Sequence, residues 1–229
     1  MLAAGLFILL FGCTSSPNTT EERDPEVKAV TMHEKTSIND KLMLTPESVE
    51  LRMDMRKLWE DHVTWTRTVI CCLVDDLPGA DQAIDRLLQN QDDIGNAVKP
   101  YYGNEAGNQL SALLRDHITI SADVVKAARA GDNTSLDAAN KKWYENADAI
   151  SAFLVTANPN WELGEMQTMM HDHLKLTTKE AVARIKKDYA GDVKAYDQVH
   201  EEILEMSDML AAGIIKQFPE KFGIEYEKQ

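Results

Sequence analysis

The chain has 229 residues, of which 44% are hydrophobic and 27% charged, a balance typical of a folded globular protein rather than a disordered one. Asp and Glu outnumber Lys and Arg by 38 to 24, which gives a formal net charge of -14. Phosphate binding needs clustered positive charge, and the chain has no long basic run, so this composition argues against nucleic acid as a partner.

The first residues resemble an export signal. Met1 to Phe11 is almost wholly apolar, but these 11 residues are too few to span a bilayer, which takes roughly 20. They match the apolar region of a signal peptide. The end of this run, Leu10-Phe11-Gly12-Cys13, resembles a bacterial lipoprotein box, in which the Cys thiol is acylated.

We therefore expect residues 1–12 to be a lipoprotein signal peptide, Cys13 to be lipidated, and residues 13–44 to be a polar tether. The folded part would then lie on the extracytoplasmic side of the cell membrane, held by a lipid anchor. The alternative is a cleaved secretory signal, with Cys13 incidental and the mature protein free of the membrane.

Six helices are predicted from apolar residues that recur every three or four positions. Thr45-Pro46-Glu47 is a favourable helix start, because Thr caps the free amides, Pro suits the first turn and Glu favours the positive helix end. Breaks are expected at Pro78-Gly79, between Pro100 and Gly103, at Gly131-Asp132-Asn133, at Asn158-Pro159-Asn160 and at Gly191. The helices between these breaks cover about residues 45–77, 84–98, 104–130, 136–154, 162–190 and 192–217.

Short connections between long helices imply antiparallel neighbours, and no segment alternates as a strand would. The predicted fold is therefore all-α, an up-and-down bundle over residues 45–222 followed by a tail over residues 223–229. Cys71 and Cys72 end an apolar run within the first helix. Neighbouring Cys residues on a helix rarely bridge each other, so we interpret both as small core residues.

One short pattern occurs three times, about 55 residues apart. In each copy an Asp-His pair is followed by an apolar residue, and a Thr or Ser stands four places after the His. Repeats of this length usually mean that one supersecondary unit has been stacked, which predicts three helical hairpins. The copies are Asp61-His62 with Thr66, Asp116-His117 with Ser121, and Asp172-His173 with Thr177.

The three repeated His residues are predicted to lie at similar heights in the bundle. His62 and His117 fall within the apolar stripes of their helices, and His173 on the flank of its stripe. They come about 17, 14 and 12 residues into helices that run the same way, a difference of only about 4–8 Å at 1.5 Å per residue. His200 would lie on the order of 12 Å away, and His171 is expected to face solvent.

Three interpretations of this layer are open. In the first, the His residues are structural core residues that hydrogen-bond to nearby polar groups, and the protein is a ligand-free scaffold of the cell envelope. In the second, they bind a divalent transition metal such as zinc, copper or nickel, with the adjacent aspartates orienting the rings. In the third, the same metal supports an enzymatic reaction. The proposed metal-site residues are His62, His117, His173, Asp61, Asp116 and Asp172.

Signs of other chemistry are missing from the sequence. There is no Gly-rich phosphate loop, no Gly-x-Ser-x-Gly motif and no Cys-x-x-Cys-His haem site. With no nucleophile and base in a recognisable arrangement, we expect no hydrolase, transferase or kinase activity and name no catalytic residue.

Several longer segments resemble a family of small, uncharacterised bacterial helical proteins seen among spore-forming Gram-positives. The resemblance covers about residues 51–222 and implies a shared helical fold, but it implies no reaction. The segments are LWEDH (58–62), WTR (65–67), NQDDIGNA (90–97), KPYYG (99–103), ANPNW (157–161) and KQFP (216–219).

Overall fold

The computed structural model describes residues 44–224, so the predicted signal peptide, Cys13 and nearly all of the predicted tether lie outside the described residues. The described part is all-helical, as predicted, and has no strand. Its elements are α1 (Pro46–Asp75), α2 (Ala80–Ala130), α3 (Asn133–Ala157), α4 (Leu163–Ile185), α5 (Tyr189–Gln217) and a short 3-10 helix, η2 (Pro219–Phe222).

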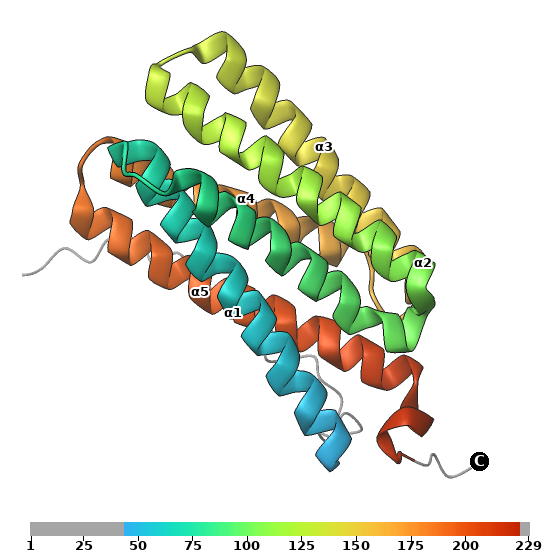
Figure 1. The fold of residues 1–229 in the computed structure, drawn as a ribbon. Helices are drawn as coiled ribbons and strands as arrows, with labels where there is room; N and C mark the ends of the chain where they lie inside the picture. The colour runs from blue at the N-terminus through green and yellow to red at the C-terminus, as the bar shows by residue number, and fades with distance from the viewer. Residues whose placement is uncertain (1–43, 225–229) are drawn as a thin grey trace, which may run out of the picture. The chain divides into compact units, whose positions relative to one another are not determined.

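Within residues 44–224 the number of α-helices is five rather than the predicted six, because the second and third predicted helices belong to one element, α2. Gly103 lies inside α2 with φ 83° and ψ 169°, a non-helical conformation that glycine adopts without a steric penalty. The ribbon reverses direction at this point (Figure 1). On the far side of the reversal, Arg115 donates hydrogen bonds to Leu88 O at 3.1 Å and to Asp92 at 2.9 Å.

The start of α1 follows the predicted pattern. Thr45 Oγ1 accepts a hydrogen bond from the Ser48 amide at 3.1 Å, and Ser48 Oγ accepts one from the Thr45 amide at 2.9 Å. The boundary between α4 and α5 differs from the prediction, since Gly191 lies within the first turn of α5. The chain turns instead at Lys187, which has a φ of 59°, and Asp188 then caps α5 by accepting from the Gly191 amide.

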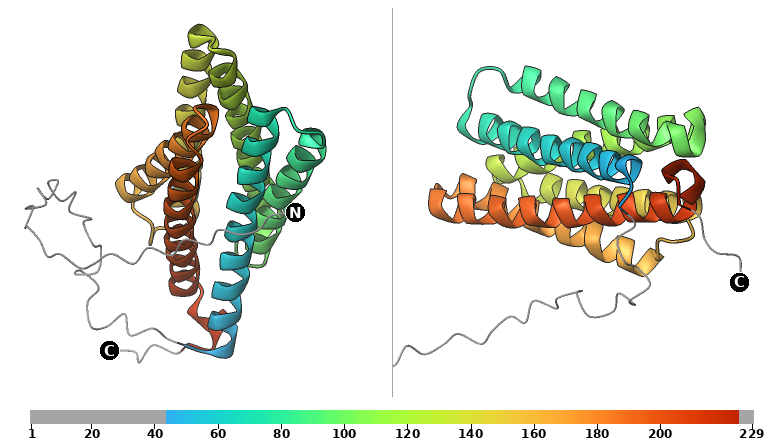
Figure 2. Two further views of the ribbon diagram at one scale, coloured as in Figure 1. Left: turned by 90° about the vertical axis from the view of Figure 1, so that its left-hand side faces the viewer. Right: turned by 90° about the horizontal axis from the view of Figure 1, so that it is seen from below.

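The helices pack side by side (Figure 1, Figure 2), and their buried apolar residues form one main cluster and two small ones. Each helix packs against the next along the chain, and α5 returns to pack against α1. The core contains side chains from all five helices, among them Met55, Leu114, Ile150, Leu174 and Ile203. No helix within residues 44–224 is long and apolar enough to cross a membrane.

Candidate functional site

The three repeated His residues are buried together in the core. His62 on α1, His117 on α2 and His173 on α4 are each no more than 4% exposed. The ring centroids of His62 and His173 lie 5.8 Å apart. The prediction that His173 lies on the flank of α4 is wrong, because the buried stripe of α4 is two residues wide and takes in both His173 and Leu174.

Each imidazole uses Nδ1 to contact a polar side chain that follows it by 29 residues. The contacts are His62 with Gln91 Nε2 at 3.2 Å, His117 with Asn146 Oδ1 at 2.7 Å, and His173 with Glu202 Oε2 at 2.8 Å. In each case the partner lies on the helical segment that runs back beside the His. The hydrogen-bond partner of each ring therefore depends on how two neighbouring helical segments pack, and not on residues of the helix that carries the His.

The hydroxyl groups one turn after each His do not bond the rings. Thr66 Oγ1 donates to the backbone oxygen of His62, and Ser121 Oγ donates to that of Ile118, both at 2.8 Å. Thr177 Oγ1 is buried and has no hydrogen-bond partner among the described residues. A Ser or Thr hydroxyl group inside a helix bonds readily to a backbone carbonyl group of the preceding turn. That carbonyl group is closer to the hydroxyl group than the His side chain is.

The aspartates that precede each His lie at the outside of the bundle. Asp116 and Asp172 are exposed, and Asp61 is half-buried and pairs with Lys57 and Arg86. Consecutive helical residues point about 100° apart, so an Asp beside an inward His is turned away from the core. These three carboxylates make no hydrogen bond to an imidazole within the described residues. The carboxylate that does so is Glu202.

His117 has both ring nitrogens in hydrogen bonds. The Asn146 amide nitrogen donates to Leu113 O at 3.0 Å, which turns Asn146 Oδ1 towards the ring to accept from Nδ1–H. On the other side, Trp143 Nε1 donates to His117 Nε2 at 3.0 Å. His117 therefore has no lone pair left for another ligand.

His62 and His173 differ from His117 in this respect. Their only hydrogen bonds to described residues use Nδ1, so Nε2 of each ring has no partner there. Buried polar atoms without hydrogen bonds gather around the same two rings: Gln91 Oε1, Glu202 Oε1, Thr177 Oγ1 and Trp59 Nε1. Trp59 packs edge-on against His62, with ring centroids 5.5 Å apart. Native cores satisfy nearly all buried polar atoms, so four unpartnered atoms beside two imidazoles are an unusual feature of this core.

Burial keeps the imidazoles of His117 and His62 neutral. Desolvation lowers the pKa of His117 to about 3, although its hydrogen bond to Asn146 opposes the shift. Desolvation also lowers the pKa of His62 well below 6.5, and the neighbouring His173 and His117 lower it further. Neutral imidazole is the form that binds metal ions. Within residues 44–224, however, no group of three or more His, Cys, Asp or Glu side chains is arranged to hold a metal ion.

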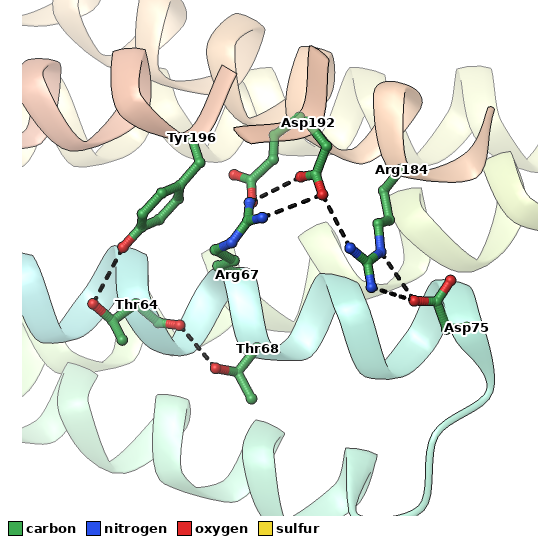
Figure 3. A network of polar contacts seen from close by, with 8 residues as sticks. Thr64, Arg67, Thr68, Asp75, Arg184, Asp192 and Tyr196 are labelled. Atoms are coloured by element: carbon green, nitrogen blue, oxygen red, sulfur yellow. Dashed lines mark hydrogen bonds and ion pairs between the residues drawn. The ribbon is translucent and has the colours of Figure 1, made fainter. Parts of the chain in front are cut away.

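A second polar cluster, which the sequence analysis missed, joins α1, α4 and α5 (Figure 3). Arg67 bonds Glu180 at 2.7 Å and Asp192 at 2.8 Å, and Arg184 bonds both Asp192 and Asp75. Glu180 and Asp192 are each only 1% exposed. Burial raises the pKa of Glu180 to about 7, with Arg67 opposing the shift. Glu180 follows His173 by seven residues, which places both on the same face of α4. This spacing in the sequence could have predicted that Glu180 is buried.

The remaining His and Cys residues lie nearer the surface. His171, which was expected to face solvent, is partly exposed, and its Nε2 lies 2.9 Å from Asp148 Oδ1. His200 Nε2 contacts Glu60 at 3.2 Å. Cys71 and Cys72 are free thiols, each half-buried rather than fully in the core. His33 lies outside the described residues. Comparison of the chain with family models, curated proteins and solved structures finds no significant match.

Proposed function

We propose that the chain is a lipid-anchored, extracytoplasmic binding protein in which His62 and His173 bind one divalent transition metal ion. The part of the proposal that concerns an anchor at Cys13 rests on the sequence alone. The observation that carries the binding proposal is the pair of buried imidazoles, 5.8 Å apart, that make no hydrogen bond through Nε2 to a described residue, with unpartnered polar atoms gathered around them.

The finer architecture that we propose is a threefold repeat of helical hairpins, with the two arms of α2 belonging to different repeats. The recurrence of a ring partner 29 residues after each His supports it. Buried residues also recur at intervals of 55 or 56. These sets are Met55, Leu110 and Met166; Trp59, Leu114 and Met170; Val63, Ile118 and Leu174; Ile94, Ile150 and Met206; and Val98, Leu154 and Leu210.

The separation of the two rings is compatible with a shared ion. A metal ion about 2.1 Å from the Nε2 atoms of two tetrahedrally arranged imidazoles puts their ring centroids about 5–6 Å apart. The observed value is 5.8 Å. Glu202 accepts from Nδ1 of His173, the arrangement that commonly orients a metal-binding imidazole. Two nitrogen ligands suit zinc, copper, nickel or cobalt, with water completing the coordination.

A ligand-free scaffold of the cell envelope is the second candidate, and His117 favours it. Both nitrogens of His117 are satisfied by side chains of its own hairpin, as expected of a structural core residue. In this alternative, buried water bridges His62, His173 and the unpartnered atoms beside them.

A metal-binding site predicts a rise in melting temperature on adding metal. An ion at 100 times its Kd stabilises the native state by about 2.7 kcal/mol, which for a domain of this size means about 5–10 °C. His173→Gln should abolish the rise, whereas His117→Gln should keep it. Thermal unfolding with and without zinc, copper, nickel and cobalt measures this, and a parent protein that responds to none of them would leave the scaffold alternative.

Lipid attachment at Cys13 predicts that a radiolabelled fatty acid is incorporated into the protein in its native host. Cys13→Ser should lose the label completely, because no other Cys lies near the predicted cleavage site. Cys71→Ser is the matched control and should retain it. Label that persists in Cys13→Ser would rule out the anchor.

A further inference from the structure

The three imidazoles of the core are set in different environments by two positions of their hairpins. One position follows the His by 29 residues and holds Gln91, Asn146 or Glu202. The other follows it by 26 residues and holds Leu88, Trp143 or Val199. Of these three residues only Trp143 has an N–H group in its side chain, and this group donates to Nε2 of His117. Leu88 and Val199 have no donor to offer to His62 and His173.

The position 29 residues on decides which ring nitrogen carries the proton. Glu202 Oε2 lies 2.8 Å from Nδ1 of His173 and accepts a hydrogen bond there, which leaves Nε2 as the nitrogen that can bind a ligand. Glu202 is the only carboxylate that bonds one of the three rings within the described residues, and its other oxygen is buried without a partner. His173 is therefore arranged as a ligand before any ion arrives.

His62 is less well prepared. The Gln91 amide nitrogen lies 3.2 Å from His62 Nδ1, and the same nitrogen donates to Leu87 O at 2.8 Å and to Asn90 Oδ1 at 3.1 Å. These two acceptors use both protons of the amide, so the amide nitrogen neither donates to Nδ1 nor accepts a proton from it. To bind an ion through Nε2, His62 must carry its proton on Nδ1 and find an acceptor there. Gln91 Oε1, which has no partner, supplies one after rotation of the amide.

We propose that Glu202, Gln91 and Trp143 are positioning residues that rank the three imidazoles as metal ligands: His173 first, His62 second, and His117 excluded. This inference rests on the proposed metal-binding function. It adds that the affinity of the site is set by residues that never touch the ion, and that Trp143 occupies the one nitrogen of His117 that could otherwise bind an ion.

The test is a titration of the full chain with Co²⁺ followed by its visible absorption, with Cys71→Ser and Cys72→Ser in every protein to remove thiolate bands. Replacing an acceptor that orients a metal-binding His typically changes affinity 10–100-fold. Glu202→Gln should weaken Co²⁺ binding by about this factor, and Gln91→Glu should strengthen it, because a carboxylate then faces Nδ1 of His62.

Asn146→Asp is the matched control. It places a carboxylate against His117, but Trp143 still occupies Nε2, so Co²⁺ affinity should stay within about threefold of the parent. Adding Trp143→Leu to Asn146→Asp releases that nitrogen and should both tighten binding and change the absorption spectrum, as a third imidazole joins the ion. Far-UV circular dichroism checks that each variant folds. If Glu202→Gln does not fold, the ranking is still tested by Gln91→Glu and by Asn146→Asp with and without Trp143→Leu.

The outcomes separate the two proposals. A parent protein that binds no Co²⁺ contradicts the proposed function and this inference with it. A parent that binds Co²⁺ with an affinity that neither Glu202→Gln nor Gln91→Glu changes overturns the ranking alone. Tighter binding in the Asn146→Asp single variant would also overturn it, since His117 would then be a ligand despite Trp143.

Discussion

Arg67→Met is expected to destabilise the protein by about 3–5 kcal/mol, since it removes one partner of a buried ion pair and leaves Glu180 buried without a cation, either unpaired or protonated against its ordinary pKa. Arg67 is the only cation that bonds Glu180 among the described residues, whereas Asp192 keeps Arg184. Glu180 is 1% exposed and cannot recover its solvation by turning outward. Urea unfolding at pH 8, above the Glu180 pKa of about 7, measures the loss.

Two controls test the cause of this loss. Arg56→Met removes an exposed pair with Asp208 and should cost less than about 1 kcal/mol. Adding Glu180→Gln to Arg67→Met removes the unpaired charge and should recover much of the stability. A loss below about 1 kcal/mol in the single Arg67→Met variant would show that the cluster contributes little.

Acidification is expected to destabilise the protein through the neutral core imidazoles. The pKa of His117 is about 3 in the folded protein and 6.5 in the unfolded chain, so between these values the unfolded state binds more protons. Its contribution to stability is complete above pH 6.5 and falls by about 1.4 kcal/mol per pH unit below it, to a total of about 5 kcal/mol at pH 3. His62, whose pKa is also lowered, acts in the same direction.

Glu180 opposes this trend over part of the range. Its pKa is raised from 4.5 to about 7, so protonation favours the folded state as the pH falls from 7 to 4.5. The free energy of unfolding should therefore fall gently between pH 6.5 and 4.5, and steeply below pH 4.5. Urea unfolding at a series of pH values measures both slopes.

Single substitutions assign the slopes to residues. His117→Gln should flatten the slope below pH 4.5 by about 1.4 kcal/mol per unit, and Glu180→Gln should steepen the slope above it. An unchanged low-pH slope in His117→Gln would mean that this imidazole is not the group that resists protonation.

The helical fold and the approximate heights of the His residues could be predicted from the sequence, because both depend on local periodicity. The Thr45 cap is satisfied by Ser48, three residues away, and the apolar stripes repeat every three or four residues. The Asp-His repeat likewise predicted that His62 and His173 lie at similar heights, and their rings are 5.8 Å apart. Information of this kind is contained within one or two helical turns.

The chemistry of the layer depends on contacts between helices, which adjacency in the sequence does not reveal. Asp61, Asp116 and Asp172 were expected to orient the rings because each precedes a His, but the helix turns them outward. Glu202 reaches His173 only because α5 packs against α4 in one register, and Trp143 blocks His117 for the same reason.

The spacing of apolar residues along each helix was enough to predict that His62 and His117 enter a helical core, because burial follows from that spacing. Contacts between helices set which nitrogen of each ring is occupied and bring Arg67 to Glu180 and Asp192. These contacts join groups 26 to 125 residues apart, and the packing register of whole helices, rather than a local pattern, makes them meet.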